Sequence, residues 1–97
     1  MIQLYQAEWC PFSHRVRQLL TERGVPFVAL QVEPEAEDRD AMAEAVGERS
    51  IPVAVLDDGT VLAGDTDEVL AELDRRHPRT PHSDAHRERR WEARAFE

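Results

Sequence analysis

The chain has 97 residues, 41% hydrophobic and 33% charged, with one cysteine and a formal net charge of -8 at pH 7. This length suits one domain with one core, and the composition is that of a globular chain, not a disordered one. The negative charge argues against nucleic acid as a partner, because phosphate binding depends on lysine and arginine. No apolar run reaches the ~20 residues of a membrane span, and no signal peptide is recognisable, so we expect a cytoplasmic protein.

The first half of the chain alternates two kinds of pattern. Residues 2–7 and 26–32 are short apolar runs typical of buried strands. Residues 11–24 and 36–47 carry apolar side chains at helical spacing, and each of these segments ends in a glycine. We therefore predict strand, helix, strand and helix in that order.

The second half predicts a hairpin and a last helix. Residues 51–63 hold two β-branched runs joined by Asp57, Asp58 and Gly59, a strong hairpin signal. Residues 65–78 have the spacing of a helix that is ended by a proline. The order βαβαββα predicts an α/β fold in which a parallel pair of strands and an antiparallel pair form one four-stranded mixed sheet, with helices on both faces.

The end of the chain differs in charge from the rest. Residues 1–74 carry 16 acidic and 5 basic side chains, whereas residues 75–97 carry 4 acidic and 7 basic ones. We predict a domain over residues 1–78 and a basic C-terminal tail over residues 79–97. The tail is either disordered or forms a short extra helix over residues 84–96 that lies on the acidic body.

Cys10 precedes Pro11, which suits the first position of a helix, so the thiol is expected at a helix N-terminus. The partial positive charge there favours the reactive thiolate, and Ser13 lies within capping distance of the sulfur. Glu8 opposes this effect. The alternative is a buried, unreactive cysteine.

Three segments resemble glutaredoxins and the N-terminal domains of glutathione S-transferases, which share the thioredoxin fold. "CPFSHRVR" (10–17) resembles their Cys-Pro-aromatic-x active site with its downstream arginine, here Arg15. "GERSIPVAVLDDG" (47–59) resembles the glutaredoxin stretch Gly-x-Arg-Thr-Val-Pro, and "LAGDTDEVL" (62–70) resembles the segment that holds the γ-glutamyl end of glutathione. The resemblance covers residues 2 to about 76 and implies a thioredoxin-like (glutaredoxin-like) fold.

The active site implied by the resemblance is Cys10, Pro11, Phe12 and Ser13. Ser13 stands where many members have a second cysteine, so a mixed disulfide on Cys10 needs an external thiol to resolve it. The lysine often found just before the glutaredoxin cysteine is also absent. The helical C-terminal domain of a transferase is missing too, which argues against conventional transferase activity.

The resemblance also implies a glutathione site, made of Arg49, Ser50, Ile51, Pro52, Asp65, Thr66 and Asp67. A cis peptide bond before Pro52 would let the backbone of Ile51 pair with the cysteinyl part of glutathione. Arg49 would bind the glycyl carboxylate, and the start of the last helix would hold the γ-glutamyl end. From the residues alone, Arg49 could instead pair with the acidic second helix, and Asp65 or Thr66 could be an ordinary N-cap.

We therefore expect a monothiol oxidoreductase that uses glutathione, or another low-molecular-weight thiol, as cosubstrate and acts on glutathionylated proteins. We expect a monomer with no tightly bound cofactor and no metal, since His14, His77, His82 and His86 make no convincing ligand set. One alternative is a glutathione-binding module without catalysis, related to transferase N-terminal domains. Another is a carrier of a [2Fe–2S] cluster, against which Pro11 counts because such carriers usually have glycine there.

Overall fold

The computed structural model describes residues 1–94. Its elements follow the predicted order and add a helix at the end. They are β1 (Ile2–Gln6), α1 (Pro11–Glu22), β2 (Phe27–Gln31), the 3-10 turn η1 (Ala36–Asp38), α2 (Asp40–Val46), β3 (Val53–Val55), β4 (Val61–Leu62), α3 (Thr66–Arg76) and α4 (Ser83–Arg94).

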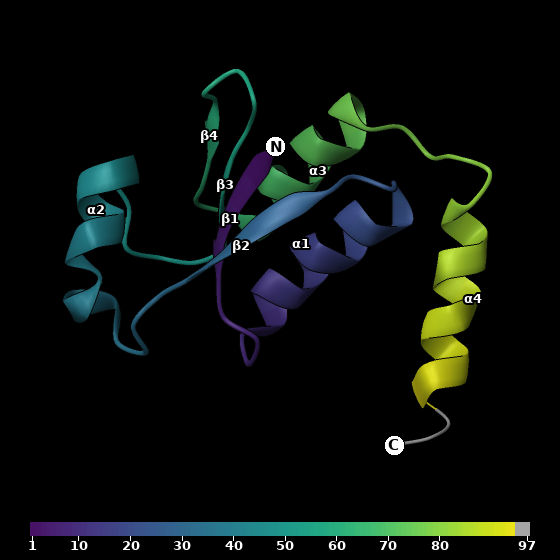
Figure 1. The fold of residues 1–97 in the computed structure, drawn as a ribbon, viewed down its shortest axis with the longest axis horizontal. Coiled ribbons are helices and arrows are strands. Elements are labelled where there is room, and N and C mark those ends of the chain that lie inside the picture. Colours follow the sequence, from purple (N-terminus) through teal and green to yellow (C-terminus); the bar gives the residue numbers. More distant parts are fainter. Residues whose placement is uncertain (95–97) are drawn as a thin grey trace.

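The four strands form one mixed sheet in the order β2-β1-β3-β4. β1 is parallel to β2, antiparallel β3 pairs with β1 so that Tyr5 lies opposite Val53, and β4 is antiparallel to β3. In Figure 1, α1 and α3 lie on one side of the sheet and α2 lies on the other. The prediction of a mixed four-stranded α/β sheet is therefore confirmed.

The core lies between the sheet and the helices α1 and α3. Alternate residues of β1 point toward these helices, which is the period of a strand with one face on a core. The buried apolar cluster contains Ile2, Leu4, Val16, Leu20, Ala54, Leu56, Val69 and Leu73. This packing fixes the ends of β1, α1 and α3 relative to one another, and with them the residues of the candidate site.

The predicted continuous helix over residues 36–47 is wrong. The chain forms a short 3-10 turn, leaves helical geometry at Arg39 and then starts α2. Arg39 is buried, and its guanidinium donates to the backbone oxygens of Glu33 at 2.8 Å, Pro34 at 3.0 Å and Arg49 at 2.7 Å. Because a buried guanidinium needs acceptors, these carbonyls account for the break.

The tail contains α4, which packs against α1. The helix expected over residues 84–96 runs from Ser83 to Arg94, and its last two expected positions lie outside the described residues. Ser83 is fully buried, and its hydroxyl donates to the backbone oxygen of Glu22 at 2.7 Å. Arg87 donates through Nε and Nη2 to the two carboxylate oxygens of Glu22, each at 3.2 Å.

Candidate functional site

Cys10 is the N-cap of α1, as Pro11 predicts. It has extended backbone angles, Pro11 follows as the first helical residue, and the Cys10 sulfur accepts a hydrogen bond from the backbone N–H of Ser13 at 3.4 Å. Only 5% of Cys10 is exposed. The thiol is therefore partly shielded at a helix N-terminus, where N–H groups and the helix dipole favour negative charge.

Several groups act together on the pKa of Cys10. Burial raises this pKa, but hydrogen bonds from the Ser13 side chain and backbone, then from the Phe12 backbone, lower it, as does the charge of Arg17. The net effect is a pKa below the ordinary value of a thiol. A larger fraction of Cys10 is therefore thiolate at neutral pH than for an unperturbed cysteine.

Arg17 is a site residue that the sequence analysis missed. It donates to the backbone oxygen of Ala7 at 3.3 Å and to the side chain of Gln6, and it forms an ion pair with Glu8 at 3.4 Å. The carboxylate of Glu8, which we expected to oppose the thiolate, is thus paired with Arg17. The spacing of residues 10, 13 and 17 puts them on one helix face and could have indicated this arrangement.

The Ile51–Pro52 peptide bond is cis, as the resemblance implies. Tyr5 pairs with Val53 across the antiparallel strands, so the residues just before β3 lie level with the end of β1 that leads to Cys10. Pro52 is buried and Ile51 is half-buried, while Ser50 is exposed. The fold therefore brings this predicted segment to the same end of the sheet as the thiol.

Arg49 pairs with the acidic second helix, which was the alternative to a role in binding the glycyl carboxylate. Its guanidinium donates to the backbone oxygens of Ala36 at 3.3 Å and Glu37 at 3.0 Å, and it pairs with Asp40 of α2 at 2.8 Å. Because the Arg49 side chain is 44% exposed and that of Asp40 is 83% exposed, this ion pair is weakly held.

The residues predicted at the start of α3 also lie at this end of the molecule. Asp65 is the N-cap of α3, and its side chain accepts from the Asp67 backbone N–H at 2.8 Å; Thr66 is the first helical residue. The Asp67 carboxylate pairs with Arg15 of α1, with Nη2 and Oδ1 2.6 Å apart. This pair joins the fifth residue of α1 to the second residue of α3, so the N-terminal parts of the two helices lie close together.

Two aromatic side chains border Cys10 in the sequence and are open to solvent. Trp9 is 67% exposed and Phe12 is 51% exposed. Trp9 and Phe12 therefore give the border of the site an apolar surface. Large apolar side chains that are exposed together often mark a surface that contacts another molecule.

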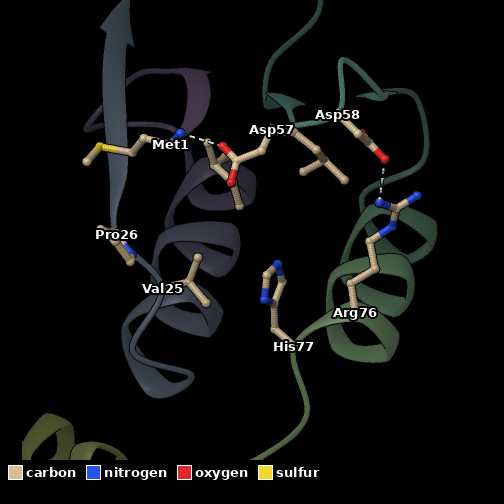
Figure 2. Close-up of a pocket in the computed structure, with 9 residues that line it drawn as sticks. Met1, Val25, Pro26, Asp57, Asp58, Arg76 and His77 are labelled. Atoms are coloured by element: carbon tan, nitrogen blue, oxygen red, sulfur yellow. Dashed lines mark hydrogen bonds and ion pairs between the residues drawn. The ribbon is translucent and has the colours of Figure 1, made fainter.

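A separate pocket lies at the other end of the sheet. It has a volume of about 430 Å³ and lies where the start of β1 meets the hairpin turn and the end of α3. Figure 2 shows His77 facing this space, with Met1 paired to Asp57 and Arg76 paired to Asp58 at its border. Hydrogen bonds from Thr60 and then Arg76 lower the pKa of Asp58 to about 2. This pocket has no part in the Cys10 site.

Within residues 1–94, no three His, Cys, Asp or Glu side chains gather in a way that could hold a metal ion. No helix of this part of the chain is long and apolar enough to cross a lipid bilayer.

Comparison with known proteins connects this geometry to a family. The family model "Glutaredoxin" matches residues 2–61. A "Probable glutaredoxin" of Synechocystis is 37% identical over 71 residues, which is 72% of this chain and 78% of that protein. Glutaredoxin 3 of Escherichia coli is 32% identical over 56 residues, 58% of this chain and 68% of that protein.

A solved structure confirms the thioredoxin-like fold. Glutaredoxin 2 of Salmonella typhimurium, crystallised in complex with glutathione, superposes with a TM-score of 0.67 at 18% sequence identity. The match covers 81% of this chain and 35% of that one, so this chain spans about a third of the length of that structure.

Proposed function

The chain belongs to the glutaredoxin family, and from this we propose that it is a glutathione-dependent thiol-disulfide oxidoreductase that works through Cys10 alone. The observation that carries the proposal is the hydrogen bond from the Ser13 N–H to the Cys10 sulfur at the start of α1. That contact, with a pKa below the ordinary thiol value, supports a nucleophilic thiolate.

In the first step, the Cys10 thiolate attacks the glutathione sulfur of a protein–glutathione mixed disulfide. The bond between the two original sulfurs breaks, and the protein thiolate leaves and takes a proton from solvent. A second glutathione thiolate then attacks the glutathione sulfur bound to Cys10, which releases the Cys10 thiolate and oxidised glutathione. Because Ser13 replaces a second thiol, this external attack is the route that returns Cys10 to its reduced state.

We propose that glutathione binds between the segment that precedes β3 and the start of α3. Its γ-glutamyl end carries one ammonium and one carboxylate, and the pair of Asp67 and Arg15 offers one charge of each sign to them. The N–H groups at the start of α3 that Asp65 does not cap would add donors for the carboxylate. Ile51 would contribute its backbone to the cysteinyl part, and Arg49 would exchange Asp40 for the glycyl carboxylate.

The test is reduction of the mixed disulfide between glutathione and a small thiol, with glutathione reductase and NADPH to report oxidised glutathione. We expect turnover by the wild-type protein and none by Cys10→Ser, with one glutathione attached to Cys10 when the protein is treated with oxidised glutathione. We also expect the pH midpoint of Cys10 alkylation by iodoacetamide to lie below that of an unperturbed thiol.

Other outcomes would redirect the assignment. A normal alkylation midpoint, together with glutathione binding but no turnover, would indicate a binding module. A brown protein whose colour is lost in Cys10→Ser would indicate a cluster carrier. We expect a monomer whose partners are glutathione and proteins that carry it as a mixed disulfide.

A further inference from the structure

Helix α4 runs back along α1 toward the end of the molecule where Cys10 lies. Its first residue, Ser83, is fastened to Glu22 at the C-terminal end of α1. Further along, Arg90 and Trp91 line the same hollow as His14, four residues after Cys10. In Figure 1, the C-terminal end of α4 and the turn before α1 both lie toward the lower side of the view.

Two grooves flank α4, and we call them together the α4 grooves. One, of about 350 Å³, lies between α4, α1 and α3, and the other, of about 450 Å³, lies between α4 and α1. His14, Gln18 and Arg90 line both of them, so the two grooves are adjacent. Their basic lining residues are His14, Arg15, His86, Arg87, Arg89 and Arg90.

The basic character of these grooves is exceptional for this protein. Residues 1–74 have a net charge of -11, whereas Glu22 is the one acidic side chain among the described residues that line the α4 grooves. The carboxylate of Glu22 forms an ion pair with Arg87. The other arginines of the grooves are Arg15, Arg89 and Arg90. Arg15 pairs with Asp67 and Arg89 pairs with Glu92, but both ion pairs are exposed and can exchange for a bound anion.

Arg89 and Arg90 are the cations best placed to receive an anion. The ion pair of Arg89 with Glu92, at 3.1 Å, is exposed on both sides and thus readily exchanged. The Nε atom of Arg90 is buried and has no hydrogen-bond partner within residues 1–94, while its guanidinium carbon lies 5.5 Å from the ring centre of Trp91. A buried donor without a hydrogen-bond acceptor is energetically unfavourable.

We infer that the α4 grooves dock an acidic segment of the glutathionylated protein that Cys10 reduces, an inference that rests on the proposed function. The lining extends along α4 from His86 to Ala93, about 10 Å at 1.5 Å per residue. An extended peptide places alternate carboxylates about 7 Å apart and so spans this row, which a single small anion does not. A nucleic acid would extend beyond the grooves onto the acidic body, which would repel it, whereas a short acidic segment need not.

A segment docked in the α4 grooves would also lie close to the Cys10 site. Arg15 lines one groove and pairs with Asp67 in the proposed γ-glutamyl site, so the groove adjoins the place proposed for glutathione. The exposed ring of Phe12 lies about one turn before Arg15 on α1. A peptide held along α4 can therefore present its mixed disulfide at Cys10.

The experiment compares two peptides with one glutathionylated cysteine each, flanked by glutamates in one and by lysines in the other. We expect the full-length protein to reduce the acidic peptide at least tenfold faster, although its own net charge of -8 would favour the basic one. The preference should shrink in 0.5 M salt, because salt screens exposed charges.

The decisive variant is R89Q/R90Q, with R75Q/R76Q as a control that changes the net charge equally. Arg75 and Arg76 end α3, away from the α4 grooves. We expect the ratio of the two peptide rates to fall in R89Q/R90Q and to persist in the control, with circular dichroism to verify folding of both. Equal ratios in the two variants, or no acidic preference in the wild type, would overturn the inference.

A binding measurement separates this inference from the proposed function. The acidic peptide, with serine in place of its cysteine, is titrated into Cys10→Ser protein with and without R89Q/R90Q. If the wild type fails to reduce even a small mixed disulfide, the proposed function fails and this titration alone decides the docking surface. Equal competition by an oligonucleotide of the same charge would show a general anion surface and would contradict the inference.

Discussion

Arg15 and Asp67, 52 positions apart in the chain, join the second turn of α1 to the first turn of α3 through an ion pair of 2.6 Å. Both side chains are well exposed, 47% and 76%, and exposed pairs of this kind add little to stability. The pair places two opposite charges near the N-termini of two helices, and the proposed γ-glutamyl site rests on that placement.

Replacement of Asp67 by asparagine should weaken glutathione binding more than folding. A charged hydrogen bond to the γ-glutamyl ammonium is worth about 1.5 kcal/mol, so we expect KM for glutathione to rise about tenfold. Steady-state kinetics with varied glutathione measure this, and urea denaturation should show an almost unchanged free energy of unfolding. Asp74→Asn, at the other end of α3, is the control. If both variants raised KM equally, the proposed γ-glutamyl site would be wrong.

Replacement of Ser13 by alanine should raise the pKa of Cys10. The Ser13 side chain is the first of the groups that lower this pKa against the effect of burial, and its loss leaves the burial effect less opposed. We expect the pH midpoint of iodoacetamide alkylation to move upward and the rate at pH 7 to fall. Thr21→Ala, an exposed position at the far end of α1, should leave the midpoint in place. An unmoved midpoint in Ser13→Ala would remove Ser13 from the account of the thiolate.

Local rules were enough to predict one half of the site. Pro11 has no N–H to lose at the start of a helix, and this alone assigns Cys10 to the N-cap. The cis bond before Pro52 came from the resemblance, since the residues by themselves favour trans. The meeting of Arg15 with Asp67 depends on the packing of α1 against α3, which no local pattern contains.

The partners of Arg39 and Arg49 also depend on the fold and could not be predicted from local sequence patterns. The helical spacing over residues 36–47 is real, but the buried guanidinium of Arg39 binds three backbone oxygens in the chain around it and the helix is interrupted there. For Arg49, the sequence offers both a ligand carboxylate and the acidic second helix as partners. In the structure, Arg49 contacts the second.

The hydroxyl of Ser83 should be a main anchor of α4. It is fully buried and donates to the backbone oxygen of Glu22 at 2.7 Å, so Ser83→Ala leaves that acceptor without its partner. We expect a loss of about 1 kcal/mol in the free energy of unfolding. Urea denaturation measures it, and His82→Ala, at an exposed neighbouring position, is the control. An equal stability of the two variants would mean that the hydroxyl does not hold α4 in solution.

The contact between α4 and α1 should weaken in acid. Burial raises the pKa of Glu22, but hydrogen bonds from Arg87 and Gln18 outweigh it, so the pKa lies below its ordinary value of 4.5. A carboxyl group whose pKa is lowered by folding stabilises the folded state above its unfolded pKa, and that contribution is lost as the pH falls through its folded pKa.

Arg87→Gln should therefore cost stability at pH 7, and the difference from the wild type should shrink as the pH falls below about 4.5. Urea denaturation at a series of pH values measures the difference. Arg89→Gln removes an ion pair whose side chains are 82% and 60% exposed, so it should cost little at any of these pH values. A constant difference between wild type and Arg87→Gln from pH 7 to pH 3 would show that ionised Glu22 is not what Arg87 stabilises.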